Sequence, residues 1–89
     1  MPALQNRQLA AILFTDIVGY TAMMQRDESG AVTAVNHHRK VLEEQVAAHQ
    51  GEVRNYYGDG SLSIFKSASE AVRCAMQIQT QLQEEPQVP

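Results

Sequence analysis

The stretch that most constrains this chain runs from Leu9 to Val18, where apolar residues occupy nearly every position except Thr15 and Asp16. A continuous apolar run predicts a strand that is covered on both faces and is therefore central in its sheet. An acid buried near the end of such a strand is costly unless it finds partners. We therefore expect Asp16 to need either a set of hydrogen-bond donors or a metal ion.

Gly19 is expected to end this strand and to turn the chain into a short helix. Thr21 is the candidate cap of that helix, which we place over residues 22–25 with its end near Arg26. A carboxylate at the top of a strand, beside free backbone N–H groups at a helix start, can hold a cation and a phosphate together. The segment 14–21 is thus a candidate site for both.

A longer helix is predicted from Glu28 to His49, with Asp27 or Ser29 as its cap and Gly51 as the glycine stop after its last turn. Apolar residues at helical spacing form an inward stripe, which comprises Ala31, Val32, Ala34, Val35, Leu42 and Val46. Polar and charged residues mostly occupy the other side, including Arg39, Lys40, Glu43 and Glu44. The helix is expected to cover the sheet.

His37 and His38 lie within this helix and raise the alternative of a metal site. Adjacent helical residues point about 100° apart, so the pair is poorly arranged to chelate one ion. The spacing also differs from the i, i+4 pairs that bind metal on helices. The sequence therefore favours a covering role for this helix over a metal site.

Two β-rich runs flank a Gly58-Asp59-Gly60 connection, and this arrangement predicts a hairpin. The first run is Glu52–Tyr57, and the second, 61–65, has Ser61, Ser63 and Phe65 on one face and Leu62 and Ile64 on the other. Asp59 is a common turn residue, because aspartate bonds to its own backbone there. A functional role for its carboxylate is the alternative.

Ser67 and Glu70 match a capping box that opens a last helix. Its apolar stripe comprises Ala71, Cys74, Ala75, Ile78 and Leu82. Cys74 is the only cysteine, and we interpret it as a small buried hydrophobe in a reduced, cytoplasmic protein.

Composition limits the classes of function. With 89 residues, 44% of them hydrophobic and 19% charged, the chain is expected to form one small globular domain. A net charge of −3 lacks the basic excess of a nucleic-acid binder. No apolar run approaches the roughly 20 residues of a membrane helix, and the first eight residues lack the hydrophobic segment of a signal peptide.

The expected element order is β-α-α-β-β-α, and its simplest packing is a three-stranded sheet with helices on one face. This is an α/β (α+β) fold, a partial sandwich of ferredoxin-like character. At least one sheet edge stays open and would ordinarily be covered by more chain or by another subunit.

Asp16 and Asp59 both lie at strand ends beside glycine-rich turns. If the hairpin lies next to the first strand, the two carboxylates come to the same rim of the sheet. They then repel each other unless a cation lies between them. Oxygen ligands with open positions suit Mg²⁺ or Mn²⁺ together with substrate phosphates.

The chain resembles the catalytic domain of class III adenylate and guanylate cyclases. The resemblance rests on two motifs in order, Phe14–Thr21 (FTDIVGYT) and Tyr57–Phe65 (YGDGSLSIF), and it covers about Gln8 to Pro89. It identifies residues 1–89 as the amino-terminal half of such a domain, with residues 1–7 as a tail and 86–89 as the truncated end.

The resemblance implies roles for individual residues. Asp16 and Asp59 would be catalytic and would bind two metal ions, Mg²⁺ or Mn²⁺, with the carbonyl of Ile17 as a further ligand. The triphosphate would meet backbone groups of Ile17, Val18, Gly19, Tyr20 and Thr21. The reaction would convert ATP or GTP into cyclic nucleotide and pyrophosphate by in-line attack of the 3′-hydroxyl.

Two departures from the family pattern bear on function. Many members carry a purine-reading lysine four positions before the second aspartate, where this chain has Asn55; Arg54 should point to the opposite face. The family pattern continues past Pro89, and its active sites form between two domains, so the expected partner is a second cyclase domain in a homodimer. The 89 residues alone are expected to be inactive. The alternative is a non-catalytic dimerisation or regulatory fragment.

Overall fold

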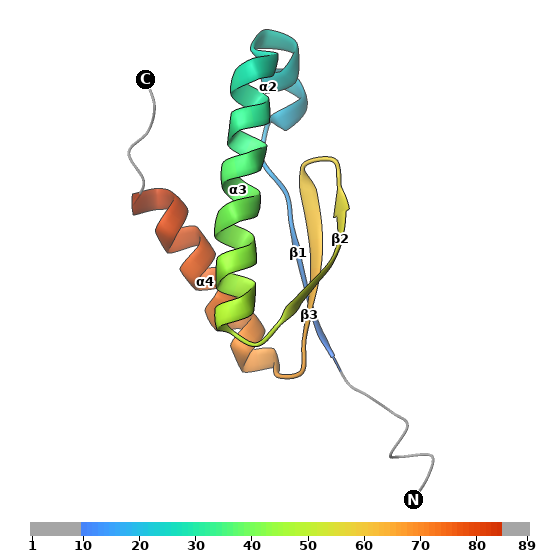
Figure 1. Ribbon diagram of the computed structural model, residues 1–89, viewed down its shortest axis with the longest axis vertical. Coiled ribbons are helices and arrows are strands. Elements are labelled where there is room, and N and C mark those ends of the chain that lie inside the picture. The colour runs from blue at the N-terminus through green and yellow to red at the C-terminus, as the bar shows by residue number, and fades with distance from the viewer. Residues whose placement is uncertain (1–9, 85–89) are drawn as a thin grey trace, which may run out of the picture.

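The computed structural model describes residues 10–84, which form one three-stranded sheet with helices against a single face (Figure 1). The elements in chain order are β1 (Ala11–Thr15), α2 (Tyr20–Arg26), α3 (Glu28–Ala48), β2 (Glu52–Tyr57), β3 (Gly60–Phe65) and α4 (Ala68–Glu84). This confirms the mixed α/β class and the order β-α-α-β-β-α. The predicted tail at residues 1–7, the start of the first strand at Leu9 and the predicted end at 86–89 lie outside the described residues.

The strand order is β1-β3-β2, and both pairings are antiparallel. The prediction that the first strand is central and covered on both faces is therefore wrong, because β3 holds the centre. Ile12 and Phe14 of β1 are 65% and 57% exposed. The apolar run has a different cause: one face of β1 packs under the helices, and the other belongs to an open apolar sheet face.

The predicted alternation along β3 is confirmed. Ser61, Ser63 and Phe65 are buried on the helix-covered face, while Leu62 and Ile64 are half-buried on the open face. Pairing extends the open face across the sheet, because Ile12 lies opposite Ile64 and Phe14 lies opposite Leu62. In β-sheets, directly paired residues point to the same side. We call the set Ile12, Phe14, Tyr57, Leu62 and Ile64 the open-face patch.

The core lies between β3 and the two long helices. Its buried members are Val41, Leu42 and Val46 of α3, Phe65 of β3, and Ala71, Cys74 and Ile78 of α4. The interpretation of Cys74 as a buried hydrophobe is confirmed, and burial raises the pKa of its thiol to about 11. The prediction for Val32 is wrong, because this residue is 46% exposed.

Two helix starts are set by different means. Asp27 caps α3, since its side chain accepts a hydrogen bond from the Gly30 backbone N–H at 3.0 Å. The predicted Thr21 cap of α2 is wrong: the helix begins at Tyr20, after Gly19 in the left-handed conformation at φ 75°. Gly19 thus supplies a turn that a side-chain cap was expected to supply.

The end of α3 also differs from expectation. Gln50, and not Gly51, adopts the left-handed conformation, at φ 63°. A Cβ atom on Gly51 would lie 2.4 Å from the ring of Phe65. Position 51 therefore requires a glycine because the ring of Phe65 occupies the place where a side chain would begin, and not because of the backbone angle. Among residues 10–84, no helix is both long and apolar enough to cross a membrane.

Candidate functional site

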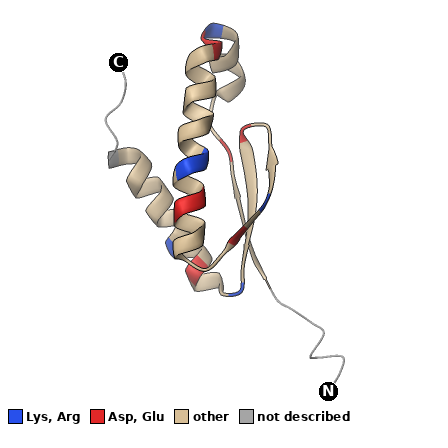
Figure 2. Ribbon diagram, in the orientation of Figure 1, with Lys and Arg blue, Asp and Glu red and all other residues tan. Residues whose placement is uncertain are grey.

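The candidate site forms where the segment after β1 meets the turn between β2 and β3. The Asp59 carboxylate accepts a hydrogen bond from the Ile17 backbone N–H, with 3.0 Å between N and Oδ2. Because this N–H belongs to the peptide that joins Asp16 to Ile17, Asp59 lies directly against the residue that carries the other acid. Figure 2 shows red acidic segments after β1 and at the turn between β2 and β3, at the same end of the sheet.

Two contacts hold β1 and β3 together at this end. The Thr15 hydroxyl and the buried Ser61 hydroxyl are hydrogen-bonded at 2.6 Å. Gly60 lets the strands approach closely, because a Cβ atom there would lie 3.0 Å from the Thr15 carbonyl oxygen. The position of Asp59 relative to Asp16 is thus set by strand pairing as well as by its own hydrogen bond.

The oxygen atoms at this corner are of the type that could ligate a hard cation. Asp16 is exposed, so the expectation that this acid is buried and therefore needs partners is wrong. Asp59 uses only one carboxylate oxygen in its bond to Ile17. The Ile17 carbonyl accepts the Tyr20 N–H at 3.3 Å and keeps a second lone pair. Among the described residues there is no group of three His, Cys, Asp or Glu side chains arranged to hold a metal. A cation here would complete its shell with water and ligand oxygens, as Mg²⁺ commonly does.

The predicted phosphate segment forms a short open loop before α2. Val18 is 93% exposed, and Gly19 turns the backbone into Tyr20. Within residues 10–84, neither the Val18 nor the Gly19 N–H donates a hydrogen bond to the protein. Thr21 lies inside the helix, so its hydroxyl does not cap it. The loop therefore presents two backbone donors to solvent beside the acidic corner.

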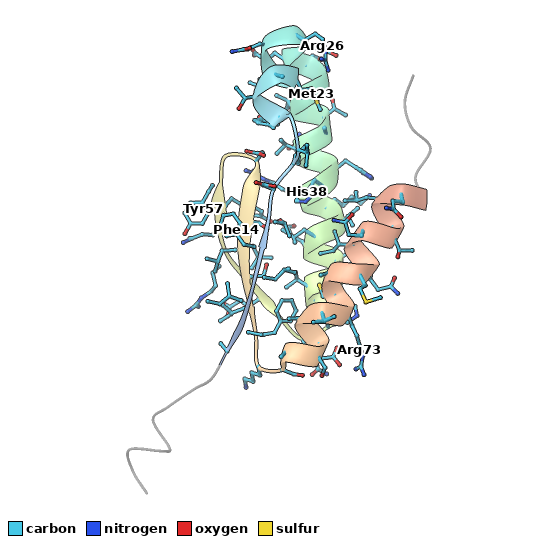
Figure 3. The ribbon with its side chains drawn as sticks, turned by 180° about the vertical axis from the view of Figure 1, so that it is seen from behind. Phe14, Met23, Arg26, His38, Tyr57 and Arg73 are labelled. Atoms are coloured by element: carbon cyan, nitrogen blue, oxygen red, sulfur yellow. The ribbon has the colours of Figure 1, made fainter. Side chains whose placement is uncertain are left out.

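His38 lies beside this corner, where the sequence interpretation had not placed a site residue. It is 8% exposed and lines a cavity of about 470 Å³ together with Asp16, Ile17 and Ile78. Figure 3 shows its side chain between α3 and β1. Burial lowers the pKa of His38, and the negative charge of Asp59 opposes that shift. The imidazole is therefore held toward its neutral form.

The position of His38 along α3 indicates that its side chain is buried. It falls three residues after Val35 and four before Leu42, and both of these are buried. The residue thus continues the inward stripe, while its neighbour His37 is exposed. The two histidines face different surroundings, as the 100° separation of adjacent helical residues predicts.

Asn55 lies apart from the acidic corner. It pairs with Leu62, which places it on the open face, and its side-chain amide donates to the Tyr57 hydroxyl at 2.9 Å. A bulge between Val53 and Asn55 shifts the register of β2, so simple alternation does not relate Arg54 to Asn55. The prediction that Arg54 lies on the face opposite Asn55 assumed a regular strand. Instead, the Arg54 guanidinium forms an ion pair with Glu52 at 3.5 Å, and Glu52 shares the open face with its strand partner Ile64.

Comparison with known proteins identifies the family. No protein-family model matches the chain. Over 75 residues, the chain is 47% identical to a protein of Rhizobium meliloti (strain 1021) named "Putative adenylate cyclase 3". The chain belongs to the class III cyclase domains. The aligned part is 83% of this chain and 13% of that relative, so the cyclase-type segment described here spans a small part of the relative's length.

Solved structures show the same fold. A bacterial light-regulated adenylyl cyclase superimposes on this cyclase-type chain with a TM-score of 0.79 and 23% identity, over 84% of this chain and 41% of that one. The adenylate/guanylate cyclase/hydrolase from Silicibacter pomeroyi gives a TM-score of 0.62 and 26% identity, over 84% of this chain and 42% of that one. The chain thus spans less than half the length of either structure.

Proposed function

We propose that residues 1–89 are the amino-terminal half of a nucleotide cyclase catalytic domain, which converts ATP or GTP into cyclic nucleotide and pyrophosphate. The observation that carries this proposal is the hydrogen bond from Ile17 to Asp59 beside Asp16. It brings two acids from distant parts of the sequence to one end of the sheet, next to a loop with unengaged N–H groups. The adenylate cyclase name of the relative that is 47% identical supports the reaction class.

In this proposal Asp16, Asp59 and the Ile17 carbonyl would hold Mg²⁺ or Mn²⁺. The bound metal would supply Lewis-acid activation of the ribose 3′-hydroxyl and charge neutralisation at the phosphates. The two carboxylates would set the position at which the triphosphate lies relative to the sheet. Losing either one removes a ligand and leaves the other acid without its partner, so both are expected to be essential.

The loop from Ile17 to Thr21 would bind the triphosphate. Val18 and Gly19 offer backbone N–H groups that donate to no other described residue. The Ile17 N–H is already bonded to Asp59, so Ile17 would contribute to triphosphate binding only through the metal ion that its carbonyl oxygen would hold. Tyr20 and Thr21 open the helix and shape the end of this cradle.

The expected partner is a second cyclase domain, which would dock on the open-face patch. Three of its members are more than half exposed, namely Ile12, Phe14 and Tyr57. An exposed apolar patch of this kind marks an interaction surface. Asn55 lies on the same face and would be placed to meet a purine held at the interface. Without a partner and the remaining segments of the domain, the 89 residues would be inactive.

The test is a chimera in which residues 10–84 replace the matching segment of the Rhizobium meliloti relative, assayed with ATP or GTP and Mn²⁺. A chimera that forms cyclic nucleotide and loses about a hundredfold or more of its rate on Asp59→Asn or Asp16→Asn would support the proposal. The unmodified relative serves as the positive control. The alternative of a non-catalytic dimerisation or regulatory fragment rests on the open-face patch, and a folded, dimeric chimera without cyclase activity would favour it.

A further inference from the structure

Arg39 of α3 bonds directly to the turn that carries Asp59. Its guanidinium donates to the Gly58 carbonyl oxygen at 3.0 Å and lies 4.3 Å above the centre of the Tyr56 ring. The Tyr56 hydroxyl in turn donates a hydrogen bond to Glu43, one helical turn along α3 from Arg39. Two residues that the sequence pattern assigned to a solvated helix face therefore connect α3 to the tip of the hairpin.

The contact acts on the peptide that leads into Asp59. The carbonyl of Gly58 and the N–H of Asp59 belong to the same planar unit, so holding the carbonyl oxygen fixes the orientation of that unit. Gly58 adopts φ 60°, and among the described residues no atom beyond its chain neighbours lies within 4 Å of the place where a Cβ would be, so side-chain packing does not hold the turn at this residue. A flexible glycine next to an acid thus receives an external anchor.

The structure assigns Arg39 as a positioning residue for Asp59. Arg39 holds the backbone of the turn at the Gly58 carbonyl, while the hydrogen bond from the Ile17 N–H holds the Asp59 carboxylate. Together the two anchors keep the carboxylate beside the Asp16–Ile17 peptide. The consequence for cation binding rests on the proposed function, whereas the effect on the turn itself does not.

Arginine suits this role better than lysine. Its planar fork donates to a carbonyl while its face stacks on an aromatic ring, and Tyr56 provides that ring. Burial raises the pKa of Tyr56 to about 12, with its bond to Glu43 as a further cause, so the ring platform stays neutral. Glu43 of α3 thus fixes the Tyr56 ring through a hydrogen bond, and the ring in turn positions the Arg39 guanidinium.

Charge and position predict opposite outcomes for cation binding. Arg39 is a positive charge near two proposed cation ligands, so electrostatics alone predicts that Arg39→Gln strengthens binding of Mn²⁺. Positioning predicts that the same change weakens it, by about tenfold, the lower end of the range for residues that orient metal ligands. Lys40→Gln is the matched control, because it removes the same charge from the next residue of α3, which is exposed.

The experiment uses the 89-residue chain and two measurements. Hydrogen exchange of the Ile17 amide in metal-free buffer reports the bond to Asp59, and titration with Mn²⁺ reports cation affinity. We expect Arg39→Gln to speed Ile17 exchange and to weaken Mn²⁺ binding, Arg39→Lys to lie between it and the wild type, and Lys40→Gln to match the wild type in exchange. Circular dichroism confirms that each variant keeps its fold.

The outcomes separate this inference from the proposed function. Unchanged Ile17 exchange in both Arg39 variants would overturn the positioning role, as would tighter Mn²⁺ binding by Arg39→Gln. If the wild type binds no Mn²⁺ at all, the proposed metal site fails. The Ile17 exchange rate of Arg39→Gln would still decide whether Arg39 holds the turn.

Discussion

Two buried serines on β3 differ in whether the hydroxyl has a hydrogen-bond partner, and this difference predicts opposite effects on stability. Ser61 bonds to Thr15 at 2.6 Å, whereas the Ser63 hydroxyl has no partner among the described residues and is fully buried. An unpaired buried hydroxyl costs stability, and a paired one adds about 1 kcal/mol. We expect Ser63→Ala to raise the free energy of unfolding and Ser61→Ala to lower it by about 1 kcal/mol, as measured by urea denaturation. Similar losses in both variants would show that Ser63 does have a partner.

A second prediction at this scale concerns pH. Burial lowers the pKa of His38 below its ordinary value of 6.5; Arg39 and His37 add to the shift, while Asp59 and Asp16 oppose it. The unfolded chain therefore binds the proton more readily than the folded one. Stability is expected to be full above 6.5 and to fall as the pH drops below it toward the lowered pKa.

Unfolding in urea at a series of pH values, in metal-free buffer, measures this effect. His38→Gln removes the titrating group and is expected to flatten the part of the profile just below 6.5. Carboxylates that titrate at lower pH are common to both proteins, so the difference between the two profiles isolates His38. Superimposable profiles would contradict the prediction.

At the scale of elements, the connection between α3 and β2 has two requirements that fall on different residues. Gln50 takes the left-handed backbone conformation, and Gly51 leaves space for the Phe65 ring. Gly51→Ala places a methyl group against the Phe65 ring, and overpacking of this kind is expected to cost about 1–3 kcal/mol. Gln50→Gly relieves a left-handed backbone at φ 63° and is expected to stabilise the fold by about 1 kcal/mol. Thermal unfolding of both variants checks the signs. A larger loss for Gln50→Gly than for Gly51→Ala would reverse the assignment.

At the scale of the whole molecule, none of residues 10–84 covers one face of the sheet, while the other face carries both long helices (Figure 1). Phe14 and Tyr57 stack on the open face, with ring centres 6.0 Å apart, and Figure 3 shows both on the side away from the helices. If this face receives a second copy, a charge placed there should prevent association. We expect the wild type to sediment as a dimer and Phe14→Asp as a monomer.

Val72→Asp provides the control for this prediction. Val72 is 59% exposed on α4, close to the 57% of Phe14, but it lies outside the open-face patch. The variant is expected to keep the dimer. A wild type that stays monomeric at high concentration, or a Val72 variant that dissociates as Phe14→Asp does, would argue against this face as the interface.

The sequence predicted most of the fold because its signals are local. Helical spacing located α3 and α4, and the alternation of β3 correctly separated Ser61, Ser63 and Phe65 from their neighbours. The glycine-rich turn predicted the hairpin, and the two acids were expected at one rim. Their use as ligands stays a prediction. The central placement of the first strand was wrong, because an apolar run does not show whether a strand has a neighbour on one side or on both sides.

The amino-acid sequence by itself determined the order of the elements and the buried faces of β3 and α4, because periods of two and 3.6 residues act within a few turns of chain. Only the tertiary structure decided that β1 lies at an edge, that Gly51 makes room for Phe65, and that Arg39 anchors the turn before Asp59. Each of these depends on a neighbour many residues away in the chain. Such contacts follow from packing, which spacing along the sequence does not encode.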